Sequence, residues 1–117
     1  SPAGHASAES ACPVSALEHD QVVAALKNVE SCSAALKVFQ GCTLAGSGDR
    51  DYSDIVRTRC EATFLSRLSR KARARYDRGQ GRCDMEYHDE PGTLYMSIRA
   101  ICRAELAASY ARRFGKR

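Results

Sequence analysis

The sequence predicts an all-α fold, a small bundle of four or five helices stapled by three disulfides. Apolar residues recur at helical intervals of three and four from about residue 14 onward, and no segment of comparable length alternates with the period of a strand. The six cysteines include no C-x-x-C pair, which favours disulfides over a zinc site. A chain of 117 residues is long enough for one domain with a modest core.

The chain divides into a tail and a domain. Residues 1–11 are rich in Ala and Ser and lack helical periodicity, so we expect a mobile N-terminal tail. Residues 12–117 then form a single disulfide-stapled helical domain. Its first helix is expected over residues 16–29, because Ser15 and Glu18 match a capping box.

The next two helices are separated by a Gly- and Ser-rich loop. The second helix is short and is expected to end at Gly41. Its apolar face consists of Cys32, Ala35, Leu36 and Phe39. Ser53 is expected to cap the third helix, because a serine hydroxyl can accept from a free amide of the first turn. The third apolar face consists of Val56, Cys60, Phe64 and Leu68.

The last two helices are separated by Pro91, which cannot continue the fourth helix, and by Gly92, which supplies an unusual backbone angle. The fourth helix has a narrow apolar stripe made of Ala72, Tyr76, Gly79, Cys83 and Tyr87. Thr93 is expected to begin the fifth helix. The fifth stripe is longer and consists of Leu94, Ile98, Cys102, Leu106, Tyr110 and Phe114, with Ile101 beside it.

The cysteine positions favour one pairing among the 15 that six cysteines allow. Residues that face each other in an antiparallel helical hairpin have a constant sum of numbers. Cys83 and Cys102 centre on the Pro-Gly turn, and Cys32 and Cys60 centre on the Gly-Ser loop. Cys12 and Cys42 remain. The predicted disulfides are therefore Cys12–Cys42, Cys32–Cys60 and Cys83–Cys102.

Basic residues are concentrated in the middle of the chain. Nine of the 18 lysines and arginines lie between Arg57 and Arg82, and the formal net charge is +4. This stretch predicts a face that binds an anionic envelope polymer or an acidic protein. A solvated helix face that keeps the protein soluble is the alternative interpretation. The candidate binding residues are Arg67, Arg70, Lys71, Arg73, Arg75 and Arg78.

Acidic residues cluster just before Pro91. Asp84, Glu86, Asp89 and Glu90, together with His88, could be ligands of a metal, but they lack the glycine of a calcium loop and a second cluster. A solvated helix end followed by a turn explains more of these residues, so we predict no metal site and no cofactor. Cysteine nucleophiles are excluded if all six thiols form disulfides, and no G-x-S-x-G elbow is present. We therefore predict that the protein is not an enzyme.

Residues 74–113 resemble the second half of the secreted, lysozyme-inhibitor-like LprI proteins of bacteria. The resemblance consists of the aromatic and basic Tyr76-Asp77-Arg78, a cysteine, an acidic turn with Gly92-Thr93, a second cysteine and a helix with leucine and arginines. It implies an exported bacterial helical protein. It also implies inhibition of lysozyme or another wall hydrolase. A basic lysozyme favours an acidic face, and only the turn with Asp84, Glu86, Asp89 and Glu90 could offer one locally.

The functional prediction is a non-enzymatic binding or structural module of the bacterial cell envelope, periplasmic or secreted. Disulfides persist outside the reducing cytosol, and this compartment argues against a nucleic acid partner. The longest apolar runs are too short to span a membrane. Inhibition of lysozyme is the alternative, although lysozymes are generally basic and this chain is basic as well.

Overall fold

The computed structural model describes residues 12–43, 48–85 and 93–115. In this part of the chain the secondary structure is helical throughout, without a strand, which confirms the predicted all-α bundle. The predicted N-terminal tail lies outside the described residues. The elements are α2 (His19–Asn28), α3 (Cys32–Cys42), α4 (Asp49–Phe64), the 3-10 turn η1 (Leu65–Arg67), α5 (Arg70–Met85) and α6 (Thr93–Phe114).

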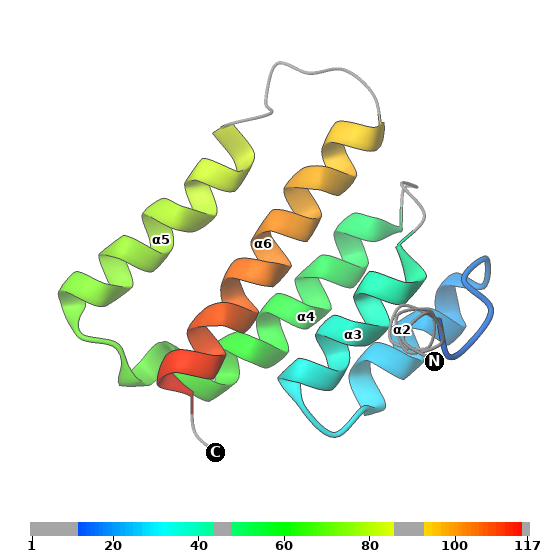
Figure 1. The fold of residues 1–117 in the computed structure, drawn as a ribbon, viewed down its shortest axis with the longest axis horizontal. Coiled ribbons are helices and arrows are strands. Elements are labelled where there is room, and N and C mark those ends of the chain that lie inside the picture. The colour runs from blue at the N-terminus through cyan, green and yellow to red at the C-terminus, as the bar shows by residue number, and fades with distance from the viewer. Residues whose placement is uncertain (1–11, 44–47, 86–92, 116–117) are drawn as a thin grey trace, which may run out of the picture.

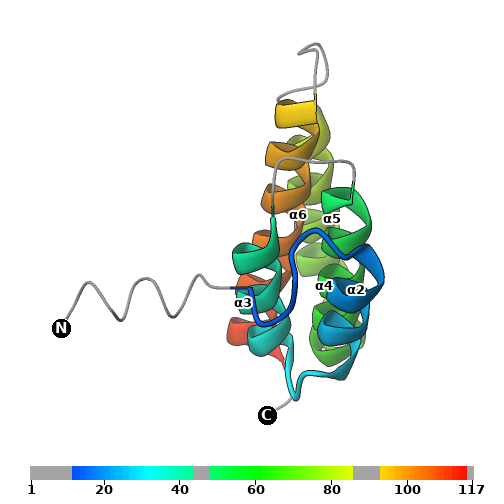
Figure 2. The same ribbon diagram turned by 90° about the vertical axis from the view of Figure 1, so that its right-hand side faces the viewer.

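The helices α4 and α6 form the centre of the molecule and make its most extensive helix contact. Figure 1 shows α5 beyond α6 on one side, and α3 and then α2 beyond α4 on the other. The view in Figure 2 shows α3 on the opposite side of the molecule from α2 and α4. Helices α2, α3, α4 and α6 therefore form a bundle, and α5 is added to the outer side of α6.

Small side chains allow α4 and α6 to pack closely. The buried face of α6 is formed by Ser97, Ala100, Ala104, Ala107 and Ala108. Two buried hydrogen bonds fix the register of the pair. The Ser53 hydroxyl donates to the carbonyl of Ala100 at 2.7 Å, and the Ser97 hydroxyl donates to the Asp49 carboxylate at 2.6 Å. Each bond satisfies a polar group that would be costly to bury alone.

The predicted apolar stripe of α6 is only half-buried. Among its described members, Ile98, Cys102, Leu106, Tyr110 and Phe114 are all partly exposed. The prediction was wrong about which face of α6 is most deeply buried. The reason is that α6 packs on three helices. Its alanine face lies in the extensive contact with α4, while its larger side chains are shared between α5, α3 and solvent.

Two predicted helix starts were also wrong. Ser15 does not cap the first helix, which begins at His19 and has Glu18 at its N-cap with no side-chain cap. The Glu18 amide instead donates to the carbonyl of Ser15 at 3.0 Å, in the turn that precedes the helix. Ser53 lies one turn inside α4, where it bonds to α6 as described above. A serine can cap a helix or fill a buried position, and its surroundings decide which.

The third helix ends earlier than predicted, so Leu68 lies in the link between η1 and α5. The Ser69 hydroxyl accepts from the amide of Ala72 at 3.0 Å and so caps α5. Helix α3 ends at Cys42, one residue after Gly41. Helix α6 begins at Thr93 as predicted, but Thr93 is its first helical residue, so the cap that was also predicted for Thr93 stays untested. Tyr87 lies outside the described residues.

All three predicted disulfides are present. The distances between the paired Cα atoms are 4.7 Å for Cys12–Cys42, 4.9 Å for Cys32–Cys60 and 5.6 Å for Cys83–Cys102. The first joins the segment before α2 to the end of α3, the second joins α3 to α4, and the third joins α5 to α6. Three disulfides fit an oxidising compartment. None of the described helices combines the length and the apolar character that crossing a membrane requires.

Candidate functional site

Helix α5 is attached to the molecule by one narrow face. Tyr76 and Cys83 are its buried residues, and Ala72, Gly79 and Gln80 are partly buried around them. Leu106 of α6 packs closely against Gly79. A Cβ atom added at Gly79 would lie 2.8 Å from Cδ2 of Leu106. The rest of α5 faces solvent. This outer surface carries most of the basic residues that the sequence analysis selected.

One row of the outer surface is purely basic. Lys71, Arg75, Arg78 and Arg82 are separated by four, three and four positions, so they follow one side of the helix. All four side chains are exposed, and no described carboxylate forms an ion pair with any of them. At about 1.5 Å per residue the row is about 17 Å long. We call these four residues the basic stripe.

The neighbouring row of α5 is mixed in charge. It consists of Arg70, Arg73, Asp77 and Asp84. Arg73 Nε lies 3.2 Å from Asp77 Oδ1, and Asp84 accepts a hydrogen bond from Arg103 of α6. Five of the six predicted binding residues are therefore divided between two rows of α5, and Arg67 lies before this helix in η1. Arg82 belongs to the basic stripe although it was not among the selected residues, and the i, i+4 spacing from Arg78 would have revealed it.

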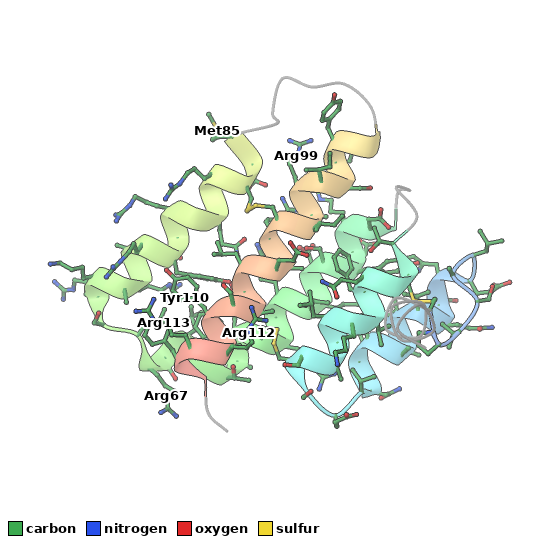
Figure 3. The ribbon with its side chains drawn as sticks, in the orientation of Figure 1. Arg67, Met85, Arg99, Tyr110, Arg112 and Arg113 are labelled. Atoms are coloured by element: carbon green, nitrogen blue, oxygen red, sulfur yellow. A yellow bond between two sulfur atoms is a disulfide. The ribbon has the colours of Figure 1, made fainter. Side chains whose placement is uncertain are left out.

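The end of α6 extends the basic surface in a way that the sequence analysis missed. Figure 3 shows Arg113 on the same end of the molecule as Arg67, where η1 precedes α5, whereas Arg112 lies on the side of α6 toward α3 and lines a pocket with Glu30 and Cys32. All three arginines are exposed, and the Arg113 guanidinium lies 5.0 Å from the centre of the Phe114 ring. Arg113 is 46 residues from Arg67 in sequence, so only the folded chain brings these two arginines to the same end.

An aromatic cluster supports the first half of α5. The ring centres of Phe64 and Tyr76 are 5.1 Å apart, and those of Tyr76 and Tyr110 are 4.9 Å apart. Tyr110 also packs against Phe114 at 5.6 Å. These rings connect α4, α5 and α6 with distances typical of favourable aromatic pairs. Together with the Cys83–Cys102 disulfide they give the basic stripe a firm base.

The hydroxyl of Tyr76 is the polar part of this cluster. It donates to Glu61 Oε2 at 2.7 Å and accepts from the Gln80 amide at 2.9 Å. Burial, and then the hydrogen bond to Glu61, raise the pKa of Tyr76 far above its usual value of 10.0. The folded protein therefore keeps this phenol neutral at a pH at which the unfolded chain ionises it.

We expect Tyr76→Phe to lower the free energy of unfolding by about 1 to 2 kcal/mol at neutral pH, because Glu61 and Gln80 lose their partner. The raised pKa adds a pH dependence. Its stabilising effect is complete below about pH 10 and declines at higher pH. Urea unfolding measures the free energy of unfolding at about pH 8 and at about pH 11. Its decrease between these two pH values should be smaller in the variant than in the wild type. Burial also raises the pKa of Tyr52, so part of the alkaline loss should persist.

Of the acidic residues that the sequence places before Pro91, the structure describes only Asp84. Asp84 is half-exposed and pairs with Arg103, whereas Glu86, His88, Asp89 and Glu90 lie outside the described residues. The inhibitor turn and the metal alternative therefore stay untested predictions. In the part of the chain that the structure describes, no three His, Cys, Asp or Glu residues come together as a metal site would require.

Comparison of the chain with family models, with curated proteins and with solved structures found no match. The resemblance of residues 74–113 to the LprI proteins therefore stays a prediction.

Proposed function

We propose that the protein is a non-enzymatic, exported binding module that uses the basic stripe of α5 to bind an anionic polymer of the bacterial cell envelope. The observation that carries the proposal is the row Lys71, Arg75, Arg78 and Arg82. It is exposed, about 17 Å long and without a described acidic partner. A solvated helix face would intersperse both signs of charge, as the neighbouring row of α5 does.

The energetics of α5 favour a ligand for this row. Like charges three or four positions apart destabilise a helix by about 0.2 to 0.5 kcal/mol for each pair. The stripe contains three such pairs, and Gly79 and Gly81 each cost about 1 kcal/mol relative to alanine. An anionic chain lying along the stripe would remove the repulsion. Binding should therefore stabilise α5 itself.

The shape of the site favours a polymer over a compact ligand. The stripe lies on the exposed outer surface of α5, so its charges form a line on an open surface and do not enclose a ligand. Repeated phosphates or carboxylates can contact successive guanidinium groups, and arginine pairs with both by two parallel hydrogen bonds. The stripe supplies three arginines and one lysine. The three disulfides agree with action in the envelope, where such polymers are found.

The test compares two variants that lose the same charge. Arg75→Gln with Arg78→Gln interrupts the stripe, and Lys27→Gln with Lys37→Gln removes two exposed lysines from α2 and α3. A basic residue near an anionic surface contributes about 1 kcal/mol. We expect the stripe variant to bind immobilised lipopolysaccharide about 10- to 30-fold more weakly at low salt. Affinity should fall less than about threefold in the lysine variant.

The salt dependence and the stability of the same proteins complete the test. The slope of affinity against salt should become shallower in the stripe variant, because fewer counterions are exchanged. All four substituted residues are exposed, so the free energy of unfolding should change by less than about 0.5 kcal/mol. Equal losses of affinity in both variants would show a diffuse effect of net charge. That result would contradict binding through the stripe.

A further inference from the structure

A second basic site lies where the end of α5 meets the first turns of α4 and α6. A pocket of about 230 Å³ opens there, and its wall is formed by Arg50, Asp84, Met96, Arg99 and Arg103. Met96, Arg99 and Arg103 are three and four positions apart and so follow one side of α6. Figure 3 shows Arg99 on this part of α6, far from Arg67 and Arg113 at the other end.

The folded chain fixes the walls of this pocket from two directions. Ser97 of α6 donates to the buried Asp49 carboxylate at 2.6 Å, and Arg50 is the next residue of α4. The Cys83–Cys102 disulfide joins α5 to α6, and the residues that follow these two cysteines are Asp84 and Arg103. A buried hydrogen bond and a covalent bond therefore fix the backbone positions from which the lining side chains extend.

The charges of the pocket are not balanced by the described residues. Arg103, whose side chain is only 14% exposed, donates to the Asp84 carboxylate. Among the described residues no other carboxylate lines the pocket, and none pairs with Arg50 or Arg99. In this part of the chain three guanidinium groups therefore face one carboxylate, which is an excess of two positive charges. Like charges in one small site repel each other, and this repulsion raises the free energy of the folded protein. A bound anion would offset the repulsion.

We propose that this pocket binds a phosphate monoester group. A phosphate monoester carries a charge of about −1.5 to −2 at neutral pH, which matches the excess of the pocket. Its oxygens suit the planar, two-pronged donors of arginine. The volume is below the roughly 300 to 1,000 Å³ of sites that enclose a whole ligand. The pocket therefore fits the phosphate itself, and the group that carries the phosphate extends into solvent.

The proposal does not depend on the basic stripe, because the two sites share no residue. The pocket selects a compact dianion, whereas the stripe follows an extended polymer. Variants of each site should therefore affect different ligands. Arg99→Gln should weaken phosphate binding and leave binding of a phosphate-free polyanion such as polyglutamate within about threefold, and Arg75→Gln with Arg78→Gln should do the reverse.

Inorganic phosphate is the first probe, measured by calorimetric titration of the oxidised protein at low salt. We expect binding to the wild-type protein and an affinity at least tenfold lower in Arg99→Gln. Asp84→Asn is expected to increase the affinity for phosphate, a result that misfolding could not produce. The substitution removes the one described carboxylate of the pocket and frees the guanidinium group of Arg103. The affinity of this variant for phosphate should rise at least threefold. Circular dichroism of each variant should confirm the wild-type helix content.

The source of the phosphate group is distinguished by a second set of probes. Sedimentation with vesicles that contain phosphatidic acid tests a monoester on a lipid, and vesicles with the same molar charge of phosphatidylglycerol test a diester. A preference for phosphatidic acid that is lost in Arg99→Gln identifies a lipid source. Binding of inorganic phosphate without that preference identifies a small soluble phosphate. Absence of phosphate binding to the wild type, or unchanged binding in both Arg99→Gln and Asp84→Asn, overturns the proposal.

Discussion

Phe64→Ala is expected to lower the free energy of unfolding by about 3 to 5 kcal/mol, the cost of removing a fully buried phenyl ring. Phe64 is 0% exposed and is the last residue of α4. Its ring packs against Tyr76 of α5 at 5.1 Å and Tyr110 of α6 at 5.7 Å. Alanine would leave a cavity where three helices meet, and two other large rings would lose contacts.

Urea unfolding followed by circular dichroism measures this change directly. The midpoint should fall while the slope stays close to that of the wild type, because the surface exposed on unfolding is almost the same. Leu17→Ala is the matched control, since Leu17 is 86% exposed and precedes α2. It should change the free energy of unfolding by less than about 0.5 kcal/mol. A loss below about 2 kcal/mol for Phe64→Ala would contradict its central place in the core.

The sequence was sufficient for the number, order and connection of the helices. Val56, Cys60 and Phe64 are spaced four apart, and this local pattern survives in the fold because a helix presents them on one side. The disulfides could be predicted for a similar reason. In an antiparallel hairpin the turn sets which residues are level, so Cys83 and Cys102 were fixed by the position of the turn between them.

The buried face of α6 could not be predicted in this way. This helix has an alanine-rich side and a side of larger apolar residues, and the pattern alone favours the larger ones. Contact with α4 selects Ala104 and Ala107, because the two helix backbones approach each other there. Ser53 was misinterpreted for the same reason. Its hydroxyl bonds to Ala100, 47 residues away, and nothing near Ser53 in the sequence indicates that partner.

The two basic sites differ in how far the sequence indicates them. The basic stripe could be found from spacing once α5 is placed, since Lys71, Arg75 and Arg78 are three and four positions apart. The phosphate pocket could not, because Arg50 and Arg99 come from different helices and meet only when α4 packs on α6. A pattern within one helix is local information, whereas a pocket between helices is a property of the packing.

Removal of the Cys83–Cys102 disulfide is expected to release α5 while the rest of the bundle stays folded. A disulfide contributes about 2 to 4 kcal/mol. The second half of α5 depends most on this bond, since Tyr76 and the aromatic cluster support the first half and Cys83 is the buried residue of the second. In Cys83→Ala with Cys102→Ala, we expect amide hydrogen exchange in α5 to become roughly 30- to 700-fold faster. Exchange in α4 should change far less.

The control is Cys12→Ala with Cys42→Ala, which removes a disulfide of similar loop length. The paired residues are 30 positions apart in the control and 19 in the test pair. On chain entropy alone this difference changes the stabilisation by only about 0.4 kcal/mol. Selective exchange in α5 would therefore reflect the position of the lost bond and not its loop length. Equally fast exchange of α5 in both variants would show that this helix opens only with the whole domain, and would contradict its selective release. With α5 released, both basic sites should weaken together, because the disulfide supports the base of the stripe and one wall of the phosphate pocket.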